Sequence, residues 1–217
     1  TASHFRCIDM IIDNAKAALT EKFIKELHLI LKSGTSDSRK DWFVVGDYKK
    51  LPNEVGGMDT ALPEEVADKM KALLTDYNAK EEKNFEDILD FHVKFERIHP
   101  FQDGNGRVGR LLITLFLMEK RRLSTPALYI SYYLKNNRIE YYDRMSEVRN
   151  KDNYEQWIKF FLNAVKDSAD ESVDTIKKLS DLHDANIDKI NGMGRAAKNA
   201  RAVFDYLEQN PIIDIGK

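Results

Sequence analysis

Residues 98–112 read IHPFQDGNGRVGRLL, and this stretch joins two helices that hydrophobic periodicity predicts. Upstream, apolar residues recur at spacings of three and four over 85–98, and the pattern stops at His99 because Pro100 disfavours helical geometry there. Downstream, residues 108–118 are apolar on almost every side, as in a helix surrounded by other helices. We therefore predict a mainly α bundle with this buried helix at its centre.

Most of the remaining chain follows the same helical pattern. Residues 8–31 predict one helix or two that meet near Thr20, and further helices are predicted over 63–77, 138–149, 153–165, 167–189 and 196–209. The exception is 42–57, WFVVG followed by DYKKLPNEVGG, which predicts a short β-hairpin. We expect one main domain over 1–190, followed over 191–217 by a linker and the start of a second unit.

The composition excludes several classes of protein. With 34 Lys+Arg against 36 Asp+Glu the net charge is -2, which argues against a broad nucleic-acid surface. A single cysteine, Cys7, excludes an internal disulfide framework and a structural zinc site, and it favours a reducing compartment. The longest apolar run, 111–118, is far shorter than the roughly 20 residues that span a bilayer. We expect a cytoplasmic protein without membrane contact, and the non-Met start allows for a longer parent chain.

The stretch after His99 also has the residue types that bind a polyphosphate. Glycines 104, 106 and 109 let backbone N–H groups approach phosphate oxygens, and the following helix start adds a partial positive charge. Arg107 and Arg110 are three residues apart, so both lie on one helix face where they can hold phosphates. The same glycines spell a dinucleotide-binding pattern, which we reject because a helix and not a strand precedes them.

Two further residues of this stretch suit a reaction on that phosphate. The Asp103 carboxylate is the kind of oxygen ligand with which Mg²⁺ binds alongside substrate phosphates. His99, fixed by the proline after it, is placed to act as a general base toward an attacking hydroxyl. His92 lies on an apolar face and is expected to be a packed core residue, whereas His28 and His183 are expected in the core or on the surface.

Residues 99–110, HPFQDGNGRVGR, match every position of the signature H-P-F-x-D/E-G-N-G-R-x-x-R, so the chain resembles the Fic (Fido) family. The similarity extends to GDYK at 46–49, VGG at 55–57 and LP at 62–63, where the family has its flap. It also includes Pro126, Ser131, the pair Tyr141 and Tyr142, and 157–162. The resemblance covers residues 8 to 165.

The resemblance implies a Fic-fold helical bundle with a small β-hairpin flap and the activity of a bacterial-type protein adenylyltransferase. Such an enzyme transfers AMP from ATP to a Ser, Thr or Tyr hydroxyl of a target protein bound along the flap. The residues that it implies are His99 as general base; Asp103 for Mg²⁺; Gly104, Asn105 and Gly106 at the α-phosphate; Arg107 and Arg110 at the outer phosphates; Val108 and Gly109 in the same binding loop; Phe101 as loop anchor; Tyr141 and Tyr142 near the adenine; and Val55, Gly56, Gly57 and Met58 as the flap edge.

Glycine at both 104 and 106 favours AMP transfer over the other reactions of the family. The alternatives are a Fic-fold transferase of another phosphate-containing group, and an ATP-binding regulator with an appended DNA-binding module. Residues 195–217 resemble the start of a winged-helix unit, so nucleic acid is expected as a partner only if a full unit follows. Lys49 replaces the more usual flap arginine, which leaves target preference open.

The inhibitory helix that many Fic proteins carry is not seen in this sequence. Its glutamate is followed by Gly or Asn, and no glutamate of this chain is. An inhibitory segment before Thr1 or an antitoxin-like partner could supply that helix, and a homodimer stays open.

Overall fold

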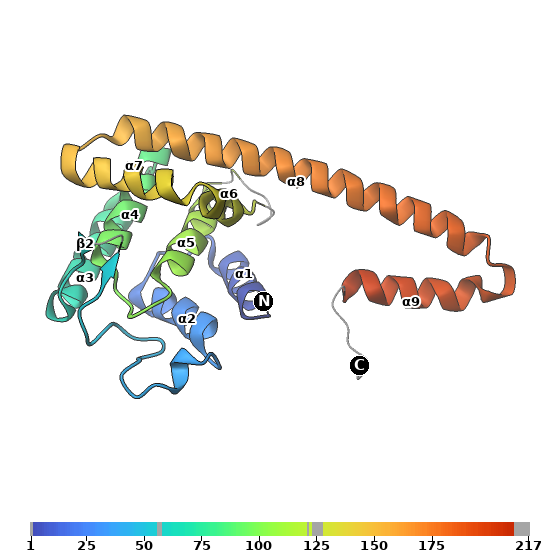
Figure 1. Ribbon diagram of the computed structural model, residues 1–217, viewed down its shortest axis with the longest axis horizontal. Helices are drawn as coiled ribbons and strands as arrows, with labels where there is room; N and C mark the ends of the chain where they lie inside the picture. Colours follow the sequence, from blue (N-terminus) through green and yellow to red (C-terminus); the bar gives the residue numbers. More distant parts are fainter. Residues whose placement is uncertain (1, 56–57, 121, 123–127, 211–217) are drawn as a thin grey trace. The chain divides into compact units, whose positions relative to one another are not determined.

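The computed structural model describes residues 2–55, 58–120, 122 and 128–210, and they form two compact units, 1–169 and 170–217 (Figure 1). The elements in chain order are α1 Ala2–Asn14, α2 Glu21–Lys32, the 3₁₀ turn η1 Asp37–Arg39, β1 Glu54–Val55, β2 Met58–Asp59, α3 Pro63–Ala79, α4 Phe85–Ile98, α5 Asn105–Glu119, α6 Ile130–Asn136, α7 Arg138–Lys151, α8 Tyr154–Asn191, the 3₁₀ turn η2 Gly194–Ala196 and α9 Ala197–Gln209. No helix in these described ranges combines the length and apolar character needed to cross a bilayer.

The predicted helices form, with two differences. Residues 8–31 fold as two helices, and Thr20 caps the second because its hydroxyl accepts a hydrogen bond from the Phe23 N–H at 3.2 Å. Residues 153–165 and 167–189 were predicted as separate helices, which is wrong: α8 runs through both because 154–191 contains no glycine or proline. The short helix α6 is an addition that periodicity did not predict.

The central helix α5 packs against hydrophobic clusters on two sides, as predicted for residues 108–118. One cluster joins α5 to α1, α2, α3 and α4, with Ile24, Phe95 and Phe116 fully buried. The other joins it to α4, α6, α7 and the first turns of α8, where Trp157 and Ile113 are fully buried. Figure 1 shows α5 between α4 and α1 in the first unit, with α2 below it. The mainly α fold with a buried central helix is therefore confirmed.

The predicted hairpin is reduced to two paired residues on each strand. Glu54 is opposite Asp59 and Val55 opposite Met58, and the turn residues Gly56 and Gly57 lie outside the described residues. The preceding stretch 42–53 is irregular and not a strand, which corrects that part of the prediction. Its N–H groups bond elsewhere: Gly46 donates to the His28 ring at 2.9 Å and Lys49 donates to the Pro100 carbonyl at 2.8 Å.

The second unit contains the C-terminal part of α8, η2 and α9, which forms at Ala197–Gln209 as predicted. His183 Nδ1 lies 2.6 Å from Glu208 Oε1 and joins the two helices. The predicted start of a winged-helix unit lies partly on 211–217, outside the described residues, and stays a prediction. The predicted domain boundary after residue 190 also stays a prediction.

Candidate functional site

The loop between α4 and α5 is held in an unusual backbone conformation. His99 caps α4 with φ 50 and ψ 61, left-handed values that are uncommon outside glycine, and Pro100 then blocks further helix. Gly104 begins α5 at φ 93, where a side chain would be strained. Such local strain costs about 1–3 kcal/mol per residue and persists only where the surrounding structure fixes it.

Two side chains inside the loop hold that conformation. Phe101 is fully buried, and its N–H donates to Asn105 Oδ1 at 2.7 Å while its carbonyl accepts from Asn105 Nδ2 at 2.7 Å. Phe101 is therefore the loop anchor that was predicted. The Asn105 side chain therefore positions the loop, and its predicted contact with an α-phosphate stays a prediction.

His99 presents one ring nitrogen for proton transfer. Its Nδ1 lies 3.2 Å from the Glu96 carbonyl, so Nδ1 carries the proton in the neutral ring and Nε2 has the free lone pair. Burial lowers the pKa of His99 to about 4, and nearby Lys49 acts in the same direction, although the Glu96 carbonyl opposes them. Near neutral pH the ring is uncharged and can accept a proton at Nε2.

Helix α2 supplies two supports for the loop that the sequence did not identify. The His28 ring is fully buried and stacks on Phe101 with centroids 4.0 Å apart. Because Gly46 N–H donates to its Nδ1, its Nε2 carries the proton and donates to the Asp103 carbonyl at 3.0 Å. Burial lowers the pKa of His28 to about 4, which keeps the ring neutral. A histidine and a lysine four apart on one helix face, at 28 and 32, were the available signal.

Lys32 is the second support, and it fixes the Asp103 carboxylate. Its Nζ is buried and lies 2.7 Å from Asp103 Oδ2 and 2.8 Å from Asp37 Oδ2. Arg107 Nη2 reaches the same Asp103 oxygen at 3.2 Å. Partial burial would raise the pKa of Asp103, but the hydrogen bonds from Lys32 and the Gly104 N–H, together with the charges of Lys32 and Arg107, outweigh it, and the pKa falls below its usual value. The carboxylate is ionised and 55% exposed, so it can bind a further ligand.

A buried polar group lies behind His99, between α4 and α5. A Cβ on Gly109 would come within 2.5 Å of Glu96 Oε1 and 3.1 Å of His92 Cε1, so the glycine allows the helices to approach. His92 Nε2 lies 2.8 Å from the Tyr141 hydroxyl, which confirms His92 as a packed, hydrogen-bonded core residue. Gly109 faces this group and lets the two helices pack closely, and its predicted nucleotide contact stays a prediction.

The arginines and tyrosines of the predicted site line one hollow. It has a volume of about 670 Å³ and receives residues from α1, α2, α5, α6 and α7, among them Arg107, Arg110, Tyr141 and Tyr142. A Cβ on Gly106 would lie 3.0 Å from Arg110 Nη1, so the glycine leaves room for that guanidinium. We call this hollow the arginine pocket. Ser3, His4, Ser131 and Arg138 also line it, and only Ser131 had been singled out from the sequence.

Other predicted residues lie away from the arginine pocket. Val108 is fully buried in the first hydrophobic cluster, and its predicted place in the nucleotide-binding loop stays a prediction. Val55 lines a further hollow of about 30 Å³ beside α4 and α7, which shares Tyr142 with the arginine pocket. Met58 pairs with it in the hairpin, and Gly56 and Gly57 lie outside the described residues. The structure therefore brings both arginines and both tyrosines together at the arginine pocket, and Tyr142 also lines the small hollow that Val55 reaches.

Lys49 lies beneath the hairpin and does not reach out to a target. Its Nζ is buried and lies 2.6 Å from Asn53 Oδ1 and 2.7 Å from Thr60 Oγ1, partners without charge. Burial lowers the pKa of Lys49 to about 8. Lys49, which stands where the flap more often has arginine, therefore links Asn53 and Thr60 at the two ends of the hairpin.

Comparison with known proteins places this site in context. Residues 18–117 match the model of the Fic/DOC family. The protein adenylyltransferase Fic of Aedes aegypti is 29% identical over 128 residues, 58% of this chain and 24% of that protein. A probable protein adenylyltransferase of Aquifex aeolicus is 59% identical over 34 residues, 16% of this chain and 11% of that protein. The chain thus spans less than a quarter of the length of these relatives.

Solved structures give the same fold. A Fic domain containing signaling protein from Bacteroides thetaiotaomicron superposes with a TM-score of 0.62 at 25% identity, over 82% of this chain and 71% of that one.

Proposed function

Because the chain belongs to the Fic/DOC family, we propose that it transfers AMP from ATP to a hydroxyl group of a target protein. The observation that carries the proposal is a loop with different chemistry at its two ends. At one end His99 holds a free Nε2 as a neutral base, and at the other Arg107 and Arg110 open into the arginine pocket.

The anion-binding end suits the phosphates of ATP. The first N–H groups of α5, those of Asn105 and Gly106, have no acceptor within the helix and point outward from its positive end. The guanidiniums of Arg107 and Arg110 add charge at the same end. The tyrosines 141 and 142 then form the wall of the pocket on which the adenine would rest.

The proposed reaction requires a single base, His99. The target hydroxyl oxygen forms a bond to the α-phosphorus while its proton moves to His99 Nε2, and the bond from that phosphorus to the bridging oxygen breaks. Pyrophosphate leaves, and AMP remains on the target as a phosphodiester. General-base assistance of this kind contributes about 10²- to 10⁴-fold to rate.

The donor set near Asp103 fits Mg²⁺ with a nucleotide. Mg²⁺ usually binds one or two carboxylates together with substrate phosphates, and Asp103 offers one ionised, exposed carboxylate beside the phosphate-binding helix start. Among the described residues no three His, Cys, Asp or Glu side chains gather as a metal site, so the phosphates would have to complete the ligand set. When bound, the ion would neutralise phosphate charge. Lys32 fixes the carboxylate that would hold it.

The transferred group is tested with ATP labelled in parallel on the α- or the γ-phosphate. The chain is incubated with host lysate, Mg²⁺ and each ATP, and label on protein is measured for wild type and for His99→Ala. Label from the α-position alone, absent in the variant, is expected. Label from both positions would contradict the proposal and indicate transfer of a larger group, and label from the γ-position alone would contradict it and indicate transfer of the terminal phosphate. No label with ATP bound would favour the regulator alternative.

A further inference from the structure

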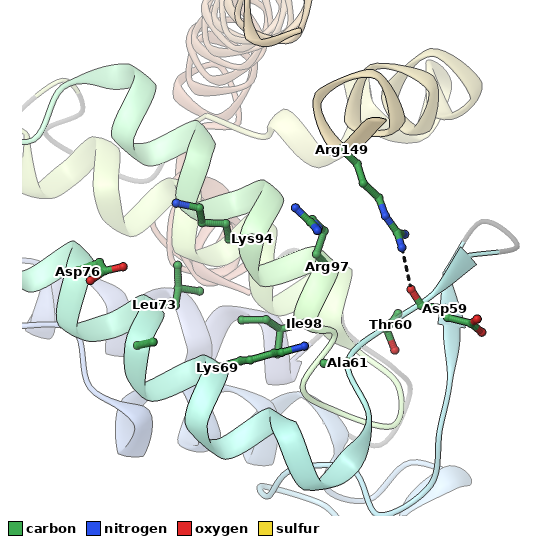
Figure 2. Close-up of a pocket in the computed structure, with 11 residues that line it drawn as sticks. Asp59, Thr60, Ala61, Lys69, Leu73, Asp76, Lys94, Arg97, Ile98 and Arg149 are labelled. Atoms are coloured by element: carbon green, nitrogen blue, oxygen red, sulfur yellow. Dashed lines mark hydrogen bonds between the residues drawn. The ribbon is translucent and has the colours of Figure 1, made fainter. Parts of the chain in front are cut away.

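A second cleft lies between α3, α4 and the end of β2, and it shares no residue with the arginine pocket (Figure 2). Its volume is about 460 Å³. Its floor is apolar, because Ala61, Leu73 and Ile98 line it and each is buried. Ile98 is the residue before His99, so the cleft reaches the base of the loop that carries the proposed catalytic histidine. We call this feature the β2 cleft.

The walls of the β2 cleft are mainly cationic, but its four cations are not equivalent. Lys69 is paired with Glu65 at 3.1 Å and Lys94 with Asp90 at 2.7 Å, each on its own helix. Arg97 and Arg149 have no carboxylate within 4.0 Å in the described part of the chain. They are the two charges of the cleft that remain available to an anion.

The two arginines come from different helices and face one space. Arg97 is on α4 and Arg149 on α7, and both line the β2 cleft and the adjoining hollow of about 30 Å³. In Figure 2 Arg149 descends from α7 toward the strand, and its Nη2 donates to the Asp59 carbonyl at 3.4 Å. This contact is long for a hydrogen bond, so a charged partner would compete with it readily.

The strand beside the arginines has an open edge. β2 pairs with β1 on one side, and no other strand pairs with it among the described residues. An unpaired strand edge is a template on which an extended polypeptide can form main-chain hydrogen bonds. Asp59 and Thr60, at and just after the end of β2, line the cleft itself. A chain paired on this edge would therefore place its flanking side chains against Arg97 and Arg149.

We propose that the β2 cleft binds an acidic segment of the target polypeptide next to its acceptor hydroxyl. Arg97 and Arg149 hold a carboxylate of that segment, and the apolar floor covers the neighbouring side chains. Asp76 lies at the opposite end of the cleft in Figure 2. The acidic residue of the bound segment is therefore expected at the end of the cleft beside β2, away from the Asp76 carboxylate. This inference rests on the proposed function for the identity of the ligand as a protein segment.

Direct peptide binding tests the inference without ATP. Three fluorescein-labelled peptides have the same sequence around a single tyrosine and differ only on one side of it, where they carry glutamates, glutamines or lysines. Fluorescence anisotropy measures the affinity of each peptide. The glutamate peptide is expected to bind wild type best. Removal of two charge-assisted contacts in Arg97→Gln/Arg149→Gln should weaken it by about tenfold or more. The matched control Arg122→Gln/Arg195→Gln removes the same charge from two exposed arginines elsewhere and should leave the affinity unchanged.

The outcomes separate this inference from the proposed function. Equal binding of glutamate and glutamine peptides, or an affinity that the Arg97/Arg149 variant does not change, would overturn the acidic-segment proposal even if AMP transfer is observed. Charge-dependent binding lost in that variant would support it even if labelled ATP gives no transfer. Circular dichroism of both double variants checks that they fold. Displacement of the peptide by inorganic phosphate alone at equal concentration would show a general anion site, which also contradicts the proposal.

Discussion

The Nδ1 atom of His99 lies 3.6 Å from Oε2 of Glu96, one turn earlier on α4. The Glu96 carboxyl is buried against Gly109, and its Oε1 has no hydrogen-bond partner in the described structure. Burial raises the pKa of Glu96 to about 7, although Arg110 opposes the shift. An ionised Glu96 would stabilise the imidazolium that forms when His99 accepts a proton, so we expect this carboxyl to tune the base.

The first prediction concerns the pH dependence of AMP transfer. The pKa of His99 is about 4 and that of Glu96 about 7, so of these two groups Glu96 is the one that changes charge near neutrality. The transfer rate should rise as pH increases through 7, because the carboxylate forms. In Glu96→Gln the rise of the rate through pH 7 should vanish. Above pH 7 the rate of the variant should be about tenfold lower than that of wild type, which corresponds to a change of one unit in the pKa of His99. The rate is followed with α-labelled ATP across pH, with Glu86→Gln on the exposed part of α4 as control. An unchanged step in Glu96→Gln would refute the assignment.

The same carboxyl predicts a pH effect on stability. Between its unfolded pKa of 4.5 and its folded pKa of about 7, the native state holds a proton that the unfolded state has released. Stability is therefore complete below the lower value and declines as pH rises toward the higher one. Glu96→Gln should gain stability relative to wild type by roughly 1 kcal/mol per pH unit across this window. Urea unfolding at several pH values measures the difference, in which contributions shared by both proteins cancel. A constant difference would count against a raised pKa.

A third prediction tests the contribution of Lys32 to the loop. Lys32→Met leaves Asp103 and Asp37 without their buried partner, and we expect a loss of about 1–3 kcal/mol, moderated because both carboxylates are partly exposed. Lys40→Met is the matched control, since Lys40 also pairs with Asp37 at 2.8 Å but is exposed. Urea unfolding should place the control within about 0.5 kcal/mol of wild type. Equal losses in both variants would show that burial of Lys32 has no special effect.

A fourth prediction concerns the close approach of α4 and α5. Gly109→Ala would put a methyl group 2.5 Å from Glu96 Oε1, and such overpacking typically costs about 1–3 kcal/mol. Gly192→Ala is the control, because its nearest contact is 3.4 Å away. In thermal unfolding, Gly109→Ala should have a lower midpoint than wild type, and Gly192→Ala should not. A stable Gly109→Ala protein would show that the helices can separate without penalty.

Sequence patterns identified the elements whose signals are local. The break at His99 follows from the proline after it, and the all-round apolar character of 108–118 indicated the central helix. Arg107 and Arg110 were grouped by helical spacing, and the structure has both in the arginine pocket. In each case the pattern lies within a few residues of the feature it predicts.

The partners of the motif came from elsewhere in the chain and were missed for that reason. His28 and Lys32 contact Asp103 across 75 and 71 positions, and single-sequence periodicity carries no information on such pairs. Glu96 was assigned no function because one buried glutamate on an apolar helix face has no local signature. The stretch 42–46 had strand-like composition, but its N–H at Gly46 bonds to a side chain of α2 instead of a strand.

The central claim is that His99 acts as the base while other residues bind ATP. His99 does not line the arginine pocket, so His99→Ala should lower the rate of AMP transfer by about 10²- to 10⁴-fold and leave the Kd for ATP unchanged. The measurement is single-turnover transfer of α-label together with an ATP titration on the same protein. A transfer rate that survives the substitution, or a loss explained entirely by weaker ATP binding, would contradict this account.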